Sequence, residues 1–247
     1  MGISSSWFVD TKSRSSARVK LFCFPYAGGS AAIYRPWATL LPPEIQLIPV
    51  ELPGRGARMK ERAFRNLHLL VQALVEAFAP LIEEDFVLFG HSMGALIAFE
   101  LARELRRRGK AQPRRLLVSG RRAPQLSETG KQLYDLPEPE FIEELHNLNG
   151  TPREVLEHEE LMALMIPMLR ADFELIETYE YHREPPLECP ITVYGGIEDT
   201  EVPRTCLSSW KEHTSAAFAI HMLAGDHFFL RSARSELLTM ISAELRR

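Results

Sequence analysis

The sequence predicts an α/β protein built on a mostly parallel sheet with helices on both faces. Short apolar runs rich in β-branched and aromatic residues alternate along the 247 residues with longer segments of helical periodicity. Several runs are apolar on both faces, which is typical of parallel strands covered by helices. A serine between two glycines follows one run directly and precedes a helical segment. This regular alternation favours a layered helix–sheet–helix arrangement.

The first half of the chain contains three of the expected strands. Pro25 and a pair of glycines end the first strand, because proline lacks an amide donor and glycine favours turns. Segments of helical periodicity follow each strand. In chain order, the expected elements are the strand VKLFCF (19–24), a helix at about 30–41, the strand QLIPVEL (46–52), a helix at about 66–82, the strand FVLFG (86–90) and a helix at about 93–108.

The second half contains three more strands. Two glycines end one of them, and Pro203 begins the helix that follows, since proline is tolerated in the first turn of a helix. The expected elements are the strands RLLVSG (115–120) and ITVYGG (191–196), a helix at about 203–213, the strand FAIHML (218–223) and a helix at about 232–246.

About seventy residues between two of these strands contain helical patterns and no convincing strand. We interpret residues 125–182 as a helical lid inserted over the carboxyl edge of the sheet, within a domain that spans 18–247. The alternative is a set of additional core helices. Residues 1–17 are polar and serine-rich, and are predicted to be a flexible segment.

Composition excludes several classes of protein. The net charge of −4, from 29 basic and 33 acidic residues, provides no global argument for binding nucleic acid or an anionic membrane. No apolar run approaches the roughly 18 residues of a membrane span, and the N-terminus lacks a signal-peptide core. Three widely spaced cysteines, without metal-type spacing, suggest a reducing cytosol and therefore a cytoplasmic protein.

Charge is unevenly distributed along the chain. Residues 103–122 contain nine basic side chains against Glu104 alone, and residues 135–160 contain nine carboxylates against Arg153 alone. Such runs are usually solvated faces. The functional alternative is an oriented field that helps a charged partner to dock.

Ser92 is the candidate nucleophile. The sequence Gly90-His91-Ser92-Met93-Gly94 fits G-x-S-x-G, with a strand before it and a helix after it. Small residues on both sides let the backbones pass closely at a sharp turn. The turn exposes the hydroxyl at the carboxyl edge of the sheet and at a helix N-terminus, which favours a developing negative charge.

A serine hydroxyl needs a base, and the base needs a carboxylate to orient it. His227 is the expected base, because it lies in the loop directly after the last strand. Asp199 is the favoured acid, in the loop after the strand 191–196. Glu198 and Glu201 are its neighbours, and Asp226, adjacent to His227, is the remaining alternative. His91 is expected to point away from the site.

The oxyanion that forms during acyl transfer needs two backbone N–H donors. Met93, directly after the nucleophile, is expected to supply one. The loop after the first strand, FCFPYAGGSAAIY, supplies the other, with Ala27 as the best donor and Tyr26 next. The glycines of this loop permit a substrate to approach closely, although they could equally form a plain turn.

Seven ordered motifs resemble the type II thioesterases, the stand-alone editing hydrolases of polyketide and nonribosomal peptide assembly lines. The resemblance runs from about residue 18 to the end. The motifs are LFCFPYAGGSA, ELPGRGAR, LFGHSMGALIAFELAREL, LNGTP, LRADFELIETYEY, GGIEDTEVP and AGDHFFL. The catalytic serine, aspartate and histidine of that family fall on Ser92, Asp199 and His227, and its oxyanion donors on Ala27 and Met93.

This resemblance implies an α/β-hydrolase fold with a mobile helical lid. It also implies a substrate, an acyl group held as a thioester on the phosphopantetheine arm of a carrier protein. Such chemistry needs no metal or cofactor, and the chain is expected to be a monomer. Two alternatives are a serine esterase acting on a free ester or acyl-CoA, and a non-catalytic binding module on a hydrolase fold.

Part of the lid is expected to form an acyl pocket. Its apolar residues recur at helical spacing, and most should pack the lid onto the core. The remainder should line the pocket, where adaptable methionines would tolerate varied acyl chains. The residues considered are Leu161, Leu164, Met165, Met168, Leu169, Phe173 and Ile176.

Overall fold

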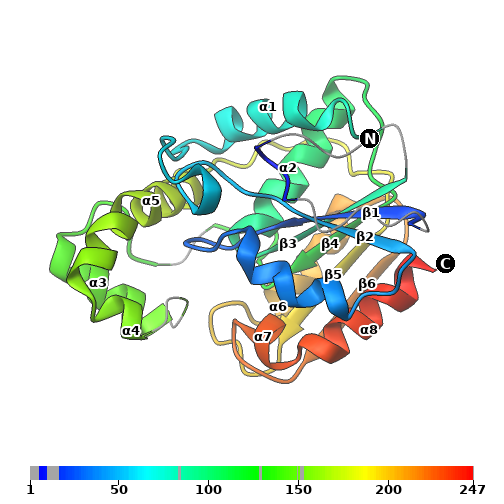
Figure 1. The fold of residues 1–247 in the computed structure, drawn as a ribbon. Helices are drawn as coiled ribbons and strands as arrows, with labels where there is room; N and C mark the ends of the chain where they lie inside the picture. The colour runs from blue at the N-terminus through cyan, green and yellow to red at the C-terminus, as the bar shows by residue number, and fades with distance from the viewer. Residues whose placement is uncertain are drawn as a thin grey trace.

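A six-stranded sheet forms the centre of the protein. The computed structural model describes residues 6–9, 17–82, 85–127, 130–148, 150 and 153–246. Within them the sheet order is β2-β1-β3-β4-β5-β6, and every neighbouring pair is parallel (Figure 1). The strands are β1 (Val19–Phe24), β2 (Ile45–Pro49), β3 (Phe86–His91), β4 (Arg115–Ser119), β5 (Ile191–Gly196) and β6 (Phe218–Leu223).

The predicted α/β architecture is confirmed, with one strand shorter than expected. β2 ends at Pro49, whereas the pattern predicted a strand to residue 52. The reason lies in the hydrogen bonds that follow. The Val50 amide still donates to Cys23 of β1, but the Glu51 amide donates to the carbonyl of Trp7 instead. The chain therefore leaves the sheet after Val50.

Helices cover both faces of the sheet (Figure 1). The α-helices are α1 (Leu67–Phe78), α2 (Met93–Arg107), α3 (Glu138–Leu148), α4 (Arg153–Leu156), α5 (Glu159–Glu177), α6 (Arg204–Ser208), α7 (Phe229–Ser232) and α8 (Arg234–Leu245). The 3-10 helices are η1 (Ala31–Thr39), η2 (Gly56–Arg58) and η3 (Ser209–His213). No helix among these described segments is long and apolar enough to cross a membrane.

The two faces of the sheet build two separate cores. Successive side chains of a strand point to opposite faces. Phe22 of β1 accordingly packs with α1 and α2, whereas Leu21 and Cys23 pack with η1 and α8. All three side chains are fully buried. This double burial explains why the strands are apolar at almost every position.

The short described piece at the N-terminus is attached to the core. Phe8 is 5% exposed and forms an antiparallel bridge with Val50. The ring of Trp7 lies beneath the guanidinium of Arg58, 4.0 Å from the ring centre to the cation. Residues 1–5 and 10–16 of the predicted flexible segment lie outside the described residues.

The basic run on α2 is paired within the molecule. Arg103 is 3% exposed, and its guanidinium contacts Glu100 at 2.5 Å and Glu184 at 2.7 Å. Arg107 contacts Glu104 on the same helix at 2.8 Å. The expectation of a solvated basic face is therefore wrong for Arg103, which is buried between carboxylates supplied by α2 and by a distant loop.

The inserted segment forms a helical module beside the sheet. Helices α3, α4 and α5 extend away from the carboxyl edge (Figure 1). They share a small core of their own, made by Phe141, Leu145, Leu156, Met162, Ile166, Met168 and Leu169. The C-terminal part of α5 also joins the main core, through Leu175 and Ile176. Helix α5 thus contributes side chains both to this small core and to the main core.

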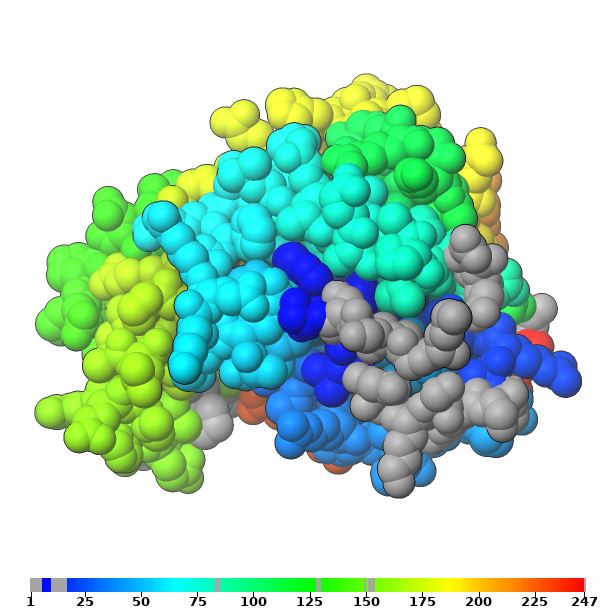
Figure 2. All heavy atoms as spheres, turned by 45° about the horizontal axis from the view of Figure 1, so that its top comes forward, coloured from blue at the N-terminus to red at the C-terminus, as the bar shows by residue number. Residues whose placement is uncertain are grey.

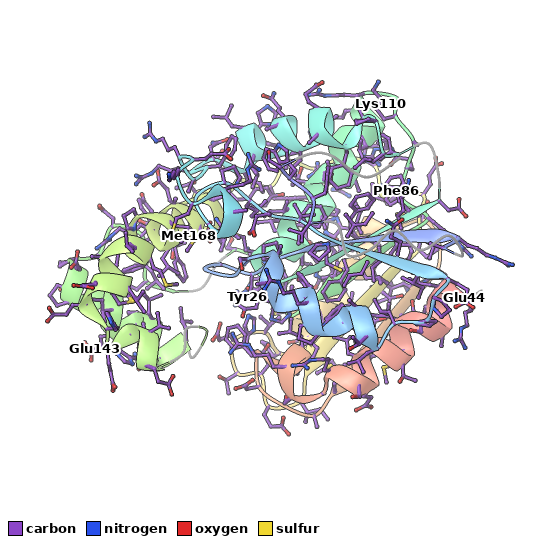
Figure 3. The ribbon with its side chains drawn as sticks, viewed as in Figure 1. Tyr26, Glu44, Phe86, Lys110, Glu143 and Met168 are labelled. Atoms are coloured by element: carbon purple, nitrogen blue, oxygen red, sulfur yellow. The ribbon has the colours of Figure 1, made fainter. Side chains whose placement is uncertain are left out.

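The module of α3, α4 and α5 lies against the segment that precedes α1. Figure 2 shows its green to yellow-green atoms beside the cyan atoms of that segment. Arg65, just before α1, forms an ion pair with Glu174 of α5. In Figure 3, Tyr26 lies at the end of β1 that faces the lid, with Met168 on α5 beyond it. The carboxyl edge of the sheet and the helices α3 and α5 line a common cavity.

Candidate active site

Ser92 stands in a strained turn between β3 and α2. Its φ of 51° and ψ of −115° make it the sole non-glycine residue with positive φ in the described part of the chain. Its amide donates to Ser119 of β4, which extends the sheet by one bond. The hydroxyl does not cap the helix that follows. Strain of this kind costs about 1–3 kcal/mol and is concentrated at functional sites.

Two glycines make this turn possible through close backbone contacts. A Cβ atom on Gly90 would lie 2.0 Å from the carbonyl oxygen of Gly94. A Cβ atom on Gly94 would lie 2.2 Å from the carbonyl oxygen of Phe24 in β1. No side chain fits at either distance, so the pattern G-x-S-x-G has a steric cause here.

The structure brings Asp199 and His227 together at the carboxyl edge of the sheet. Nδ1 of His227 lies 2.8 Å from Oδ2 of Asp199. The side chain of Asp199 is fully buried, and that of His227 is 11% exposed. Oδ1 of Asp199 accepts hydrogen bonds from the amides of Glu201 and Val202, at 2.9 and 3.0 Å. The carboxylate is therefore held on both oxygens.

The neighbouring carboxylates have other partners. Glu198 accepts a hydrogen bond from the amide of Gly225. Oδ1 of Asp226 accepts from the amide of Phe228 at 2.8 Å and so closes the turn that carries His227. Burial raises the pKa of Glu201, which lines the cavity near Ser92. Of the four candidate acids, Asp199 is the one hydrogen-bonded to the imidazole of His227.

The electrostatics keep Asp199 ionised. Burial by itself would raise the pKa of this carboxyl group. The hydrogen bond and charge of His227 and the two backbone amides outweigh burial, so the pKa of Asp199 lies below its usual value. An ionised carboxylate at this distance holds the Nδ1–H tautomer of the imidazole and leaves Nε2 to accept a proton.

The two expected oxyanion donors come from the loop after β1 and from the start of α2. Ala27 lines the same cavity as Ser92 and His227, and Met93 is the first residue of α2. Neither amide donates a hydrogen bond to another group in the described part of the chain. Both N–H groups can therefore serve an incoming oxygen, and the N-terminus of α2 adds a favourable dipole.

Ser92 and His227 face one cavity but are not hydrogen-bonded to each other among the described residues. Such bonds are often loose in free enzymes and tighten when substrate binds. The cavity has a volume of about 710 Å³, which is within the range of small-molecule sites.

Helices α3 and α5 supply an apolar wall of this cavity. The apolar lining residues from α3 and α5 are Leu145, Leu148, Leu169, Phe173 and Ile176. The expectation that methionines line it is wrong for Met165 and Met168. Met168 is buried in the core of the lid, and Met165 borders a separate cavity beside Gly28. Leu161 and Leu164 are exposed, at 42% and 65%. Leucine, isoleucine and phenylalanine side chains, and neither of these methionines, therefore form this wall.

Sequence reasoning missed His91, which lies against His227 rather than away from it. The two ring centres are 5.1 Å apart, and Nδ1 of His91 lies 2.9 Å from the hydroxyl of Ser119. Burial, and then the positive charges of His227 and Arg231, hold its pKa well below the usual value. A neutral ring thus packs behind the candidate base. Its position directly before the nucleophile was the available signal.

Comparisons with known proteins identify the family of this chain. The family model for the thioesterase domain matches residues 19–245. The protein named "Linear gramicidin dehydrogenase LgrE" from Brevibacillus parabrevis is 45% identical over 98% of this chain and 93% of its own length. Its name mentions a dehydrogenase, but the present sequence contains no dinucleotide-binding G-x-G-x-x-G motif.

Solved structures extend the similarity to the whole fold. The thioesterase RedJ of prodiginine biosynthesis in Streptomyces coelicolor is 36% identical, with a TM-score of 0.87, over 94% of this chain and 87% of that one. The type II thioesterase BorB of the borrelidin cluster is 34% identical, with a TM-score of 0.87, over 98% and 97% of the two chains. The chain therefore belongs to the thioesterase family, as a type II thioesterase with the α/β-hydrolase fold.

Proposed function

We propose that Ser92 is the nucleophile of this thioesterase, that His227 is its general base, and that Asp199 orients His227. The amides of Ala27 and Met93 bind the oxyanion. One observation carries the proposal: the strained Ser92 and the Asp199–His227 pair open onto the same cavity, beside two unengaged amides. A residue held in strain and an aligned base are what a serine nucleophile needs.

In the first half of the reaction, His227 Nε2 takes the proton of the Ser92 hydroxyl. Oγ attacks the thioester carbonyl carbon, and the two amides stabilise the negative oxygen that forms. The C–S bond then breaks, and the imidazolium gives its proton to the departing sulfur. A thiol has a pKa near 8.5, so its thiolate leaves more readily than an alkoxide.

In the second half, the same imidazole takes a proton from water. The hydroxide equivalent attacks the acyl-serine carbonyl, and the oxyanion again rests on the amides of Ala27 and Met93. The C–O bond to Ser92 breaks, the imidazolium returns a proton to Oγ, and a free carboxylic acid leaves. Each proton thus passes through His227, which is why its tautomer matters.

The substrate class is an acyl group on the phosphopantetheine arm of a carrier protein. The names of its relatives place those proteins in gramicidin, prodiginine and borrelidin biosynthesis. The apolar wall from α3 and α5 suits an acyl chain, and a cavity of about 710 Å³ accommodates one of moderate length. Hydrolysis there frees carriers loaded with stalled or incorrect acyl groups.

The inserted helices act as a lid, within a hydrolase domain that spans 18–247. They must open for a tethered arm and close to exclude water.

The chain acts as a monomer in the cytoplasm. Its cysteines, Cys23, Cys189 and Cys206, are all unpaired thiols, which suits a reducing compartment.

Turnover of one acyl group on three leaving groups tests the substrate class. The substrates are an acyl-carrier protein, the matching acyl-CoA and the p-nitrophenyl ester, each with wild type and with Ser92→Ala. We expect the highest kcat/KM on the carrier and no turnover by Ser92→Ala. A preference for the free ester would favour the esterase alternative instead.

A fluorophosphonate probe separates catalysis from mere binding. Wild type should become labelled at Ser92, and Ser92→Ala should not. A folded wild-type protein that binds the acyl-carrier but resists the probe would be a binding module rather than an enzyme, and the assignment of the triad would be wrong.

A further inference from the structure

A buried ion pair joins the lid helix α5 to the loop after β2. Arg55 and Asp172 lie 117 residues apart in the chain, and their side chains are 4% and 2% exposed. The contact is bidentate, with Nη2–Oδ1 at 2.6 Å and Nη1–Oδ2 at 2.8 Å. Desolvating two charges offsets most of their attraction, so stability alone is a weak explanation for this pair.

The same two side chains hold the turn that follows β1. Oδ2 of Asp172 accepts a hydrogen bond from the amide of Gly28 at 2.8 Å. Nη1 of Arg55 donates to the carbonyl of Gly29 at 3.1 Å. Leu169, on the same face of α5, packs on Gly28, where an added Cβ would lie 2.6 Å from its Cδ2. Helix α5 therefore fixes this turn by charge and by contact.

The turn sets the direction of the Ala27 amide. The amide of Gly29 donates to the carbonyl of Tyr26 at 2.9 Å, and Gly28 has a φ of +77°, as the third residue of a type II turn requires. The peptide bond between Tyr26 and Ala27 is trans and planar, so the N–H of Ala27 points opposite to the carbonyl of Tyr26. Fixing the turn therefore fixes this donor.

We propose that Arg55 and Asp172 are positioning residues for the oxyanion hole, through which the lid helix sets the Ala27 amide. The inference rests on the role proposed above for Ala27. Preorganised donors stabilise a transition state because they need no reorientation as charge develops. A donor held by a lid helix is aligned when that helix is seated, so this ion pair couples lid position to acyl transfer.

Asp172→Asn tests the inference, with Glu174→Gln as its matched control. Glu174 lies on the same helix and pairs with Arg65, but it does not contact the turn, and both partners are partly exposed, at 23% and 48%. We measure kcat and KM on an acyl-N-acetylcysteamine thioester, inhibition by the corresponding acyl trifluoromethyl ketone, and Tm. The ketone forms a hemiketal with Ser92 whose oxyanion occupies the hole.

Asp172→Asn should lower kcat about 10- to 100-fold, since a displaced donor costs most of what a deleted one costs. Inhibition by the ketone should weaken by a similar factor, while KM stays within about threefold, because ground-state binding does not need the oxyanion donors. Glu174→Gln should keep kcat and inhibition by the ketone within about twofold of wild type, as expected for an exposed ion pair.

A double variant, Arg55→Met with Asp172→Leu, guards against misfolding. Replacing a buried ion pair by apolar residues of similar size often preserves stability. This variant should keep a Tm close to wild type and still lose kcat and ketone affinity together. Wild-type kcat and inhibition in either Asp172 variant, or losses in kcat that only follow Tm, overturn the inference.

Labelling by fluorophosphonate shows whether a negative result overturns only the role of the Arg55–Asp172 pair or the proposed catalytic function as well. A wild-type protein that is labelled and hydrolyses the thioester, while Asp172→Asn matches it, removes only the role of the ion pair. A wild-type protein that is neither labelled nor active removes the role of Ala27 as well, and the inference with it.

Discussion

Nδ1 of His227 lies 2.8 Å from Oδ2 of Asp199, although 28 residues separate them in the chain. They meet because β5 and β6 are parallel neighbours, so the loops that follow both strands leave the sheet at the same edge. Asp226 is adjacent to His227 in sequence, yet its carboxylate bonds to the Phe228 amide instead. Proximity in the sheet, not in the chain, pairs acid and base.

Replacing each aspartate by asparagine should distinguish the role of Asp199 from that of Asp226. Asp199→Asn should lower kcat by about 10⁴-fold, because the amide stabilises the wrong tautomer of His227. Asp226→Asn removes one charge from a turn and should cost far less than tenfold. Steady-state turnover of one thioester by both variants is the measurement. Equal losses, or a larger loss for Asp226→Asn, would transfer the role of acid to Asp226.

The two substitutions Ser92→Ala and Ser92→Gly should be equally inactive but unequally stable. Loss of the nucleophile should reduce turnover by about 10⁴-fold or more. The backbone at φ 51° and ψ −115° suits glycine and strains alanine. Ser92→Gly should therefore exceed Ser92→Ala by about 1 kcal/mol in free energy of unfolding. Chemical denaturation measures this difference, and equal midpoints would mean that the turn stores little strain.

His213 should make the protein less stable in mild acid. Burial, and then the charge of Arg103, lower its pKa from 6.5 to about 4. Its ring packs against Phe99 and Trp210. Between these two pH values the unfolded chain binds a proton that the folded protein excludes, so stability rises with pH across this window. The stabilising contribution of neutral His213 is fully present above about pH 6.5 and is lost as the pH falls toward 4.

Replacing His213 tests this pH dependence. Between pH 6.5 and 4, His213 should lower the free energy of unfolding by at most about 3 kcal/mol, because one pKa unit corresponds to about 1.4 kcal/mol. His213→Phe should flatten the fall in stability between pH 6.5 and 4 relative to wild type, as measured by urea unfolding at a series of pH values. His91 remains in the variant, and its lowered pKa acts in the same direction, so part of the slope should persist. If the fall in stability were as steep in His213→Phe as in wild type, the pKa of His213 would be the same in the folded and unfolded states.

Hydrogen exchange should be graded along the lid. Amides in α3 and in the first half of α5 should exchange faster than those of β3, because these helices pack mainly on one another. The second half of α5 should be better protected, since Asp172 and Leu175 join it to the core. An acyl-phosphopantetheine mimic on Ser92 should slow exchange in α3. Protection of the whole lid equal to that of β3 would indicate a rigid insertion without gating.

Local patterns in the sequence were sufficient to locate the strands and the candidate triad. Buried parallel strands are apolar on both faces, so their positions could be recognised from short runs such as FVLF. The turn around Ser92 needs two small residues for steric reasons, which leaves a readable motif. Asp199 and His227 could be proposed because each directly follows a strand, and parallel strands end at a common edge.

Tertiary packing decided the features that connect distant segments. No pattern near Arg55 indicates that it meets Asp172, because 117 residues and a separately packed lid lie between them. Whether a lid residue lines the cavity depends on how its helix is rotated against the core. Phe173 accordingly lines the cavity, and Met168 does not, although both are apolar residues of the same helix. The sequence by itself determined which groups can react, and the tertiary structure decided which groups hold them in place.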